Sequence, residues 1–184
     1  LKTAVTGVAL SNLVTFQLSP ALGGYENQRT VDFYEQLLAN LRAVPEVKAS
    51  ALAAVSILSG DEWDNSMSVE GHQAKDGEDM QAFMNALSPG YFATMGIALL
   101  EGRDFTRQDV KENPKVAIVN RRFAEHFFPG TSAVGRRIGH GTGPKPTPDV
   151  EIVGVVPDTF HERPRDGVPR PGPVPHRGRR APAS

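Results

Sequence analysis

Residues 152–156 read Ile-Val-Gly-Val-Val, a run without a polar side chain. A run this short and this apolar suits a strand at the centre of a sheet, where both faces are covered. A second apolar strand is expected at residues 115–119, ahead of a helix that Asn120 can cap. No window holds the roughly 18 consecutive apolar residues that a membrane-spanning helix needs. The 184 residues are therefore expected to form one generous domain or two small lobes, soluble as given.

Charge is unevenly distributed along the chain. Residues 163–184 carry six Arg and six Pro against one Asp, which leaves residues 1–162 with 14 basic and 20 acidic residues. An acidic body offers no positive face for phosphates, so nucleic acid is not an expected partner. Because prolines lack the backbone donor and exclude a helix, residues 163–184 are expected to be an extended, disordered or altered tail.

The first third of the chain predicts a strand, a helix and a second strand, at residues 13–18, 31–41 and 48–58. The first strand alternates, with Val14, Phe16 and Leu18 on one face. Thr30 can cap the helix, and Pro45 ends it.

The middle of the chain predicts a hairpin followed by a short helix. Alternating segments at residues 66–70 and 80–87 flank a polar, glycine-containing stretch that suits a hairpin connection. Residues 88–96 are typical of one short helix, for which Ser88 supplies the N-cap oxygen and Gly96 the left-handed turn past the end.

The second half adds more strands. Residues 97–100 are expected to form a short strand before a turn in which Arg103 or Asp104 satisfies loop groups. Residues 134–138 and 150–156 predict a pair of strands around a Gly/Pro-rich excursion. The whole pattern favours an α+β fold with two lobes of mixed sheet and helices on one face of each sheet.

The histidines give no catalytic or metal-binding pattern. None stands at the i+4 spacing of a helical metal site, and no carboxylate motif lies beside them. They are His72, His126, His140, His161 and His176. Solvent-facing or locally capped rings are expected, although rings distant in sequence could still meet in space.

An acidic cluster around Trp63, formed by Asp61, Glu62 and Asp64, lacks the ligand spacing of a calcium loop. A solvated turn is expected there, and the alternative is that Trp63 anchors a partner protein.

Two further patterns fall short of an active site. Residues 139–145 are rich in glycine like a phosphate loop, but prolines follow where a helix should begin. Ser56 and Ser59 lie in no nucleophile elbow. We therefore expect no enzyme activity, no catalytic residue, no cofactor and no metal. The absence of cysteine also excludes disulfides and thiol catalysis.

Four blocks with a characteristic order and spacing extend over residues 12–160. They read NLVTF (12–16); FYEQLL (33–38) with VPEV (44–47); SPGYFATMGI (88–97) with GRDF (102–105); and VAIVN (116–120) with FFPG (127–130), VGRRI (134–138) and IVGVV (152–156). In these blocks the chain resembles the periplasmic core domain of MacB-like and FtsX-like ABC transporter permeases.

The resemblance implies a porter-like lobe, lobe A, of about residues 12–58 with a return strand at about 150–156. It also implies a second mixed lobe, lobe B, of about residues 66–138, so that the core domain covers residues 1–162. After the IVGVV strand the family adds a strand that ends in an apolar-x-Pro-Tyr pattern, of which residues 173–176 are an echo.

In function, the resemblance implies a domain without bond chemistry, inserted between the first two membrane helices of a permease on the periplasmic or extracellular side of the inner (cell) membrane. Such a domain couples cytoplasmic ATP hydrolysis to motion outside the membrane, in efflux or in lipoprotein or other substrate transport. The implied partners are an ABC ATPase domain or subunit, a second permease copy, and in efflux assemblies a membrane fusion protein and an outer-membrane channel. The alternative is a stand-alone extracytoplasmic ligand-binding or sensor domain, which requires an apolar pocket with convergent polar groups.

Overall fold

The computed structural model describes residues 12–19, 28–55, 64–111, 115–141, 148–158 and 173–175. The helices are α1 (Gln28–Arg42), α2 (Tyr91–Thr94), α3 (Arg107–Lys111) and α4 (Arg121–Phe127). The strands are β1 (Asp64–Val69), β2 (Gln81–Phe83), β3 (Glu101–Gly102), β4 (Lys115–Asn120), β5 (Arg137–His140), β6 (Val150–Val156) and β7 (Pro173–Pro175). This is the α+β class expected from the sequence.

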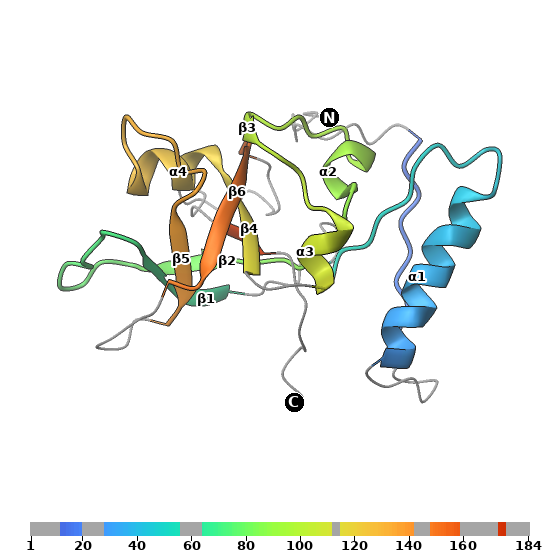
Figure 1. The fold of residues 1–184 in the computed structure, drawn as a ribbon, viewed down its shortest axis with the longest axis horizontal. Coiled ribbons are helices and arrows are strands. Elements are labelled where there is room, and N and C mark those ends of the chain that lie inside the picture. The colour runs from blue at the N-terminus through green and yellow to red at the C-terminus, as the bar shows by residue number, and fades with distance from the viewer. Residues whose placement is uncertain are drawn as a thin grey trace, which may run out of the picture.

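The seven strands form one mixed sheet in the order β2-β1-β5-β6-β4-β7, with β3 paired to β6 (Figure 1). β4 and β6 are parallel, and the other pairs are antiparallel. The ends of the order, β2 and β7, contact each other, so the sheet is strongly curved. The expectation that the apolar run at 152–156 forms a central strand is confirmed.

The two faces of the β4–β6 pair belong to two separate core clusters. Ala117 and Val119 point into the cluster that α4 covers, whereas Val116 and Ile118 point into the cluster that α2 covers. Such alternation follows from the period of two along a strand. Helices therefore lie on opposite faces of this sheet, and the expectation of helices on one face is wrong. A register shift between Ala117 and Ile118 inserts one extra residue of β6 without opening either cluster.

β3 pairs antiparallel with β6, and Gly102 and Gly154 are register partners in this pair. We call their close approach the glycine crossing. A Cβ on Gly154 would stand 2.6 Å from the carbonyl oxygen of Arg103, and a Cβ on Gly102 would overlap the carbonyl oxygen of Val153. Gly102 also has a left-handed backbone, with φ of 73°. Only glycine satisfies both conditions at this crossing.

The backbone ladder extends beyond this glycine pair. Leu100 N donates to Val155 O at 2.8 Å, and Arg103 N donates to Val153 O at 2.9 Å. The strand predicted at 97–100 therefore lies a few residues later, because β6 offers its free edge only there.

The unit β4–α4 agrees closely with the sequence. Asn120 Oδ1 accepts a hydrogen bond from Phe123 N at 2.9 Å and caps α4 as expected. Phe123 and Phe128 are buried beneath the helix, and Phe127 is half-buried. The predicted hairpin at 66–70 and 80–87 is confirmed as the antiparallel pair β1–β2, with β2 shorter than expected.

The N-cap role predicted for Ser88 is wrong. Gly90 stands at the N-cap of α2 in a left-handed conformation with no side-chain cap, whereas Ser88 Oγ accepts a hydrogen bond from Leu52 N at 2.9 Å. Gly96 has the positive φ that was expected for it. The Ser88 hydroxyl bonds to Leu52 because the extended segment that contains Leu52 has backbone groups that need hydrogen-bond partners.

That segment is residues 51–55, which lie in the described part, residues 48–55, of the strand predicted at 48–58. It makes one isolated bridge, Ala53 to Leu87, rather than a ladder. The side chain of Asn85 replaces further backbone pairing, since its Oδ1 accepts from Val55 N at 3.0 Å and its Nδ2 donates to Val55 O at 2.8 Å.

The helix predicted at 31–41 is confirmed as α1, which already extends from Gln28, so Thr30 lies within it rather than capping it. α1 lies to one side of the sheet (Figure 1). The strand predicted at 13–18 is wrong. These residues form no ladder, and Val14 and Phe16 are 82% and 59% exposed. An alternating segment becomes a strand only where a neighbouring strand pairs with it.

Gly102→Ala is expected to destabilise the chain by about 2–4 kcal/mol, because a methyl group at a positive φ adds to a clash with a backbone carbonyl. Gly130→Ala is the matched control, since Gly130 has a φ of 71° but nothing within 4 Å of its Cβ position. It should lose only about 1–2 kcal/mol. Urea unfolding of both variants measures the difference, and equal losses would contradict the role of the crossing.

Candidate functional site

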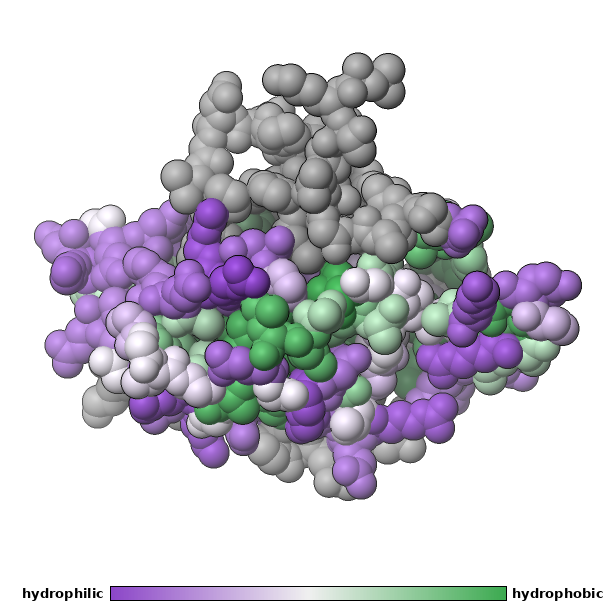
Figure 2. All heavy atoms as spheres, turned by 90° about the horizontal axis from the view of Figure 1, so that it is seen from above, coloured by the Kyte–Doolittle hydropathy of each residue, from purple (hydrophilic) through white to green (hydrophobic). Residues whose placement is uncertain are grey.

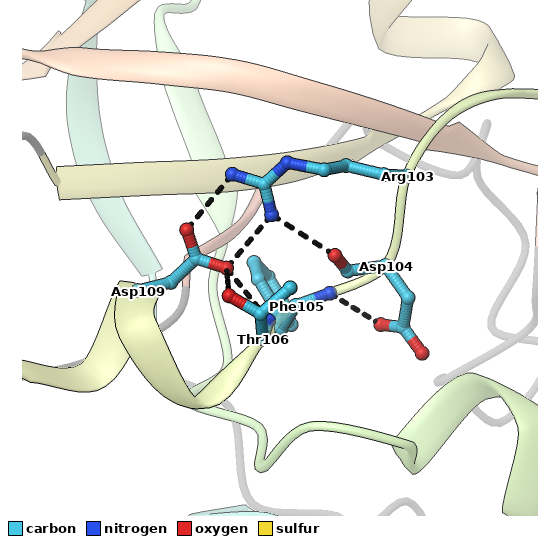
Figure 3. Close-up of polar contacts among 5 residues, drawn as sticks. All are labelled: Arg103, Asp104, Phe105, Thr106 and Asp109. Carbon is cyan, nitrogen blue, oxygen red and sulfur yellow. Dashed lines mark hydrogen bonds and ion pairs between the residues drawn. The ribbon is translucent and has the colours of Figure 1, made fainter.

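Polar groups between β3 and the first turns of α3 form a network of hydrogen bonds (Figure 3). Arg103 Nη1 donates to Asp109 Oδ2 at 2.7 Å, and Arg103 Nη2 donates to Asp109 Oδ1 at 2.8 Å. The same Oδ2 accepts from Thr106 N at 2.6 Å and from Thr106 Oγ1 at 2.8 Å. We call residues 103–109 the anchored loop.

Local sequence explains much of this arrangement. Thr106 and Asp109 have the spacing of a capping box, in which an acidic side chain returns to the backbone N–H three residues earlier. Asp104 fixes the turn before it, since its Oδ1 accepts from Phe105 N at 2.7 Å. The expectation that Arg103 or Asp104 satisfies loop groups is confirmed. Asp109 was missed, although the Thr-x-x-Asp pattern could have identified it.

These contacts shift the pKa values of Asp109 and Arg103. Hydrogen bonds from Arg103, opposed by burial and supported by the bonds from Thr106, lower the pKa of Asp109 to about 2. The hydrogen bond to Asp109 raises the pKa of Arg103, while burial opposes that shift. The Asp109 side chain is 8% exposed and that of Arg103 48%. Both groups are therefore charged at neutral pH and stabilise the loop rather than exchange protons.

A second polar cluster contains two of the five histidines. Glu78 Oε1 lies 3.0 Å from His72 Nε2 and 3.8 Å from His126 Nε2. His72 follows β1, whereas His126 lies on α4, so the fold brings together rings that are 54 positions apart. The sequence contains no local signal for this meeting. His140 is an exposed residue at the end of β5.

Several sequence candidates lie outside the described residues. They are His161, His176, Trp63, Asp61, Glu62, Ser56, Ser59 and residues 142–147 of the glycine-rich excursion. Asp64 is described and stands exposed at the start of β1.

Within the described ranges, no group of three or more acidic or histidine side chains is arranged to hold a metal ion. None of the described helices has the length and hydropathy needed to cross a membrane.

Apolar side chains are unusually exposed in the part of the chain around α1. Among the described residues, the exposed large hydrophobic side chains in this part are Val14, Phe16, Leu18, Val31 and Val44, and Leu100 before β3 is also exposed. The Tyr34 hydroxyl of α1 donates to Leu18 O at 3.3 Å, which holds residues 12–19 beside the helix. Figure 2 shows one face of the molecule, where the largest green apolar area lies near the centre of the view and not at the end where α1 lies in Figure 1.

Asp109→Asn is expected to cost about 1–2 kcal/mol at pH 7, less than the full pKa shift implies because the Arg103 side chain is half exposed. The ion pair contributes above the unfolded-state pKa of Asp109, and its contribution is lost as pH falls toward about 2. The difference between the parent chain and the variant should therefore shrink below about pH 4 in urea titrations.

Asp149→Asn is the control, because the Lys115–Asp149 pair is exposed on both sides. It should change stability by less than about 1 kcal/mol. An Asp109→Asn effect that persists unchanged at low pH would contradict the electrostatic explanation.

Among the solved structures that this chain matches, one with a TM-score above 0.5 shows a shared fold. The periplasmic region of MacB from Actinobacillus actinomycetemcomitans is similar with a TM-score of 0.51 and 14% sequence identity, over 78% of this chain and 55% of that one. The extracellular domain of the noncanonic ABC-type transporter YknZ from Gram-positive bacteria matches with a TM-score of 0.45 and 23% identity, over 77% of this chain and 61% of that one. A domain of a putative permease protein from Porphyromonas gingivalis matches with a TM-score of 0.42 and 14% identity, over 61% and 45% of the two chains.

The chain thus spans about half the length of the solved structures that it matches. Among curated proteins, none matches it. Residues 1–169 match the model of the MacB-like periplasmic core domain family. That match includes both strands of the glycine crossing and the anchored loop, and this chain belongs to the family of MacB-like periplasmic core domains.

Proposed function

We propose that this chain is the extracytoplasmic domain of an ABC transporter permease, and that it couples ATP hydrolysis on the cytoplasmic side to motion outside the membrane. The observation that carries the proposal is the family match over residues 1–169. The family is non-catalytic, so the domain acts through its shape and its contacts.

The polar contacts support this proposal. The carboxylate of Asp109 is occupied by Arg103 and Thr106, and that of Glu78 by Lys75 N and His72. Charged groups used in this way stiffen loops, and lobes that move as rigid bodies must each be stiff internally.

We further propose two lobes, with residues 12–58 in the first and residues 66–138 in the second. The position of α1 beside the sheet, and the isolated bridge from Ala53 to Leu87 in place of a continuous ladder, support this division. β6, which the sequence assigns to the first lobe, pairs with β4 and β5 in the sheet of the second. Motion of the first lobe would then be carried through residues 51–55.

The proposed partners are an ABC ATPase domain or subunit, connected through permease helices, and a second permease copy. In a Gram-negative efflux assembly, a membrane fusion protein and an outer-membrane channel would complete the set. Two similar structures, the periplasmic region of MacB and the extracellular domain of the transporter YknZ, support the extracytoplasmic position. The exposed apolar residues around α1 offer a surface for such contacts.

Cysteine labelling tests the extracytoplasmic position, because these 184 residues contain no cysteine. We expect Ala74→Cys, on an exposed position of the β1–β2 connection, to react with a membrane-impermeant maleimide on intact cells that express the parent protein. Ala117→Cys is fully buried and should react only after unfolding. The unlabelled parent protein provides the background, and an Ala74→Cys variant that reacts only after lysis would place the domain in the cytoplasm.

A disulfide between Ala53→Cys and Leu87→Cys tests the coupling. Bridge partners on antiparallel segments have Cβ atoms close enough for a disulfide, and the bond would pin residues 51–55 to the sheet-bearing part. In the complete permease with its ATPase, oxidation should lower transport-coupled ATP hydrolysis, and reduction should restore it. Each single-cysteine variant is the control. Unchanged hydrolysis in the oxidised double variant would contradict motion through this segment without affecting the labelling result.

A further inference from the structure

One carboxylate connects the loop between β1 and β2 to helix α4. We call residues 70–80 the hairpin loop. Glu78 Oε2 accepts a hydrogen bond from Lys75 N at 2.8 Å, which fixes the carboxylate within the loop. Its other oxygen, Oε1, lies 3.0 Å from His72 Nε2 in the loop and 3.8 Å from His126 Nε2 on α4. The two imidazoles therefore face the same oxygen from two different elements.

An aromatic ring orients both histidines. The ring of Phe127 lies 5.1 Å from the ring of His72 and 4.5 Å from that of His126, edge to face in both cases. The side chains of His72, Glu78 and His126 are 25%, 19% and 55% exposed, so their protons exchange with solvent. The cluster is held in place and remains accessible to water.

Glu78 is negative across the range in which histidines titrate. The hydrogen bond from Lys75 N, followed by the two histidines when they are charged, lowers the pKa of Glu78 against an opposing effect of burial. An imidazole usually changes its charge between about pH 8 and pH 5. Within that range the Glu78 carboxylate stays negative.

Other charged groups on the two elements do not substitute for these partners. In the hairpin loop, Glu70 Oε2 accepts from Arg137 N, Asp79 Oδ1 accepts from Gln81 N, and the side chains of Lys75 and Asp76 are exposed. On α4, Arg121 and Glu125 are exposed, and the backbone N–H of Arg122 donates to Asp158. The charges that act on the Glu78 carboxylate come from His72 and His126.

We propose that His72, Glu78 and His126 form a pH-sensitive latch, which holds the hairpin loop more firmly against α4 when the histidines are protonated. A charged imidazole and an ionised carboxylate stabilise each other by the same free energy, so protonation and closure of the latch are linked. Below the lowered pKa of Glu78 the carboxylate gains a proton, and the latch weakens again. The latch is therefore strongest in mildly acid solution. It rests on contacts within this chain alone and not on the transport function.

Hydrogen exchange of the hairpin-loop amides in the 184-residue chain tests the latch. Protection factors, which remove the intrinsic pH dependence of exchange, should rise roughly two- to five-fold between about pH 8 and pH 5.5, the range expected for a partly exposed ion pair. Glu78→Gln should abolish this rise. Glu125→Gln removes the same charge from an exposed α4 position next to His126 and should keep the rise.

His126→Gln provides a second test, because this position is more than half exposed and the amide preserves a donor without titrating. Its pH-dependent rise should be reduced, with protection at pH 8 near that of the parent chain. Added salt should also reduce the rise in the parent chain. The proposal is overturned if the parent chain and Glu78→Gln respond equally to pH, or if Glu125→Gln loses the response as completely as Glu78→Gln.

Discussion

The close approach of β3 to β6 at Gly102 and Gly154 is the constraint on which the rest of the sheet depends. At this point the main-chain atoms of each strand occupy the space that a side chain on the other strand would need. β6 pairs with β4 along one edge and with β5 and β3 along the other. The two glycines come from the separate sequence blocks GRDF and IVGVV. Their meeting explains why each block has a glycine at that point, since a Cβ on either residue would meet a main-chain carbonyl.

The glycine crossing also determines where the charged residues lie. Arg103 follows Gly102 directly and, with its backbone N–H bonded to β6, its guanidinium reaches Asp109 at the start of α3. A short helix of five residues has little stability of its own, so the ion pair and the Thr106 bonds hold it in place. Carboxylates bound in this way serve structure, which agrees with membership in a non-catalytic family.

Much of the fold could be predicted from local sequence patterns, and particular residues show where such patterns fail to predict the structure. Asn120 caps α4 because the cap and its N–H partner are three residues apart. Ser88, with an equally good capping pattern, bonds instead to Leu52, 36 positions away. The alternation at 13–18 is as regular as that of a strand, yet its side chains are exposed since no described strand pairs with it. The histidine pair on Glu78 has no sequence signal, because its members come from separate elements.

By itself, the sequence determined the family, the α+β class, the central position of residues 152–156, the helix α1, the hairpin and the β4–α4 unit. These features depend on side-chain periodicity and on helix caps. Both act between residues that are only a few positions apart in the sequence, so the local backbone conformation determines them. Only the tertiary structure decided that helices cover both faces of one sheet, that Glu78 meets two histidines and that Gly102 meets Gly154. Contacts of this kind depend on how distant segments cross, and that geometry is a property of the whole packed chain.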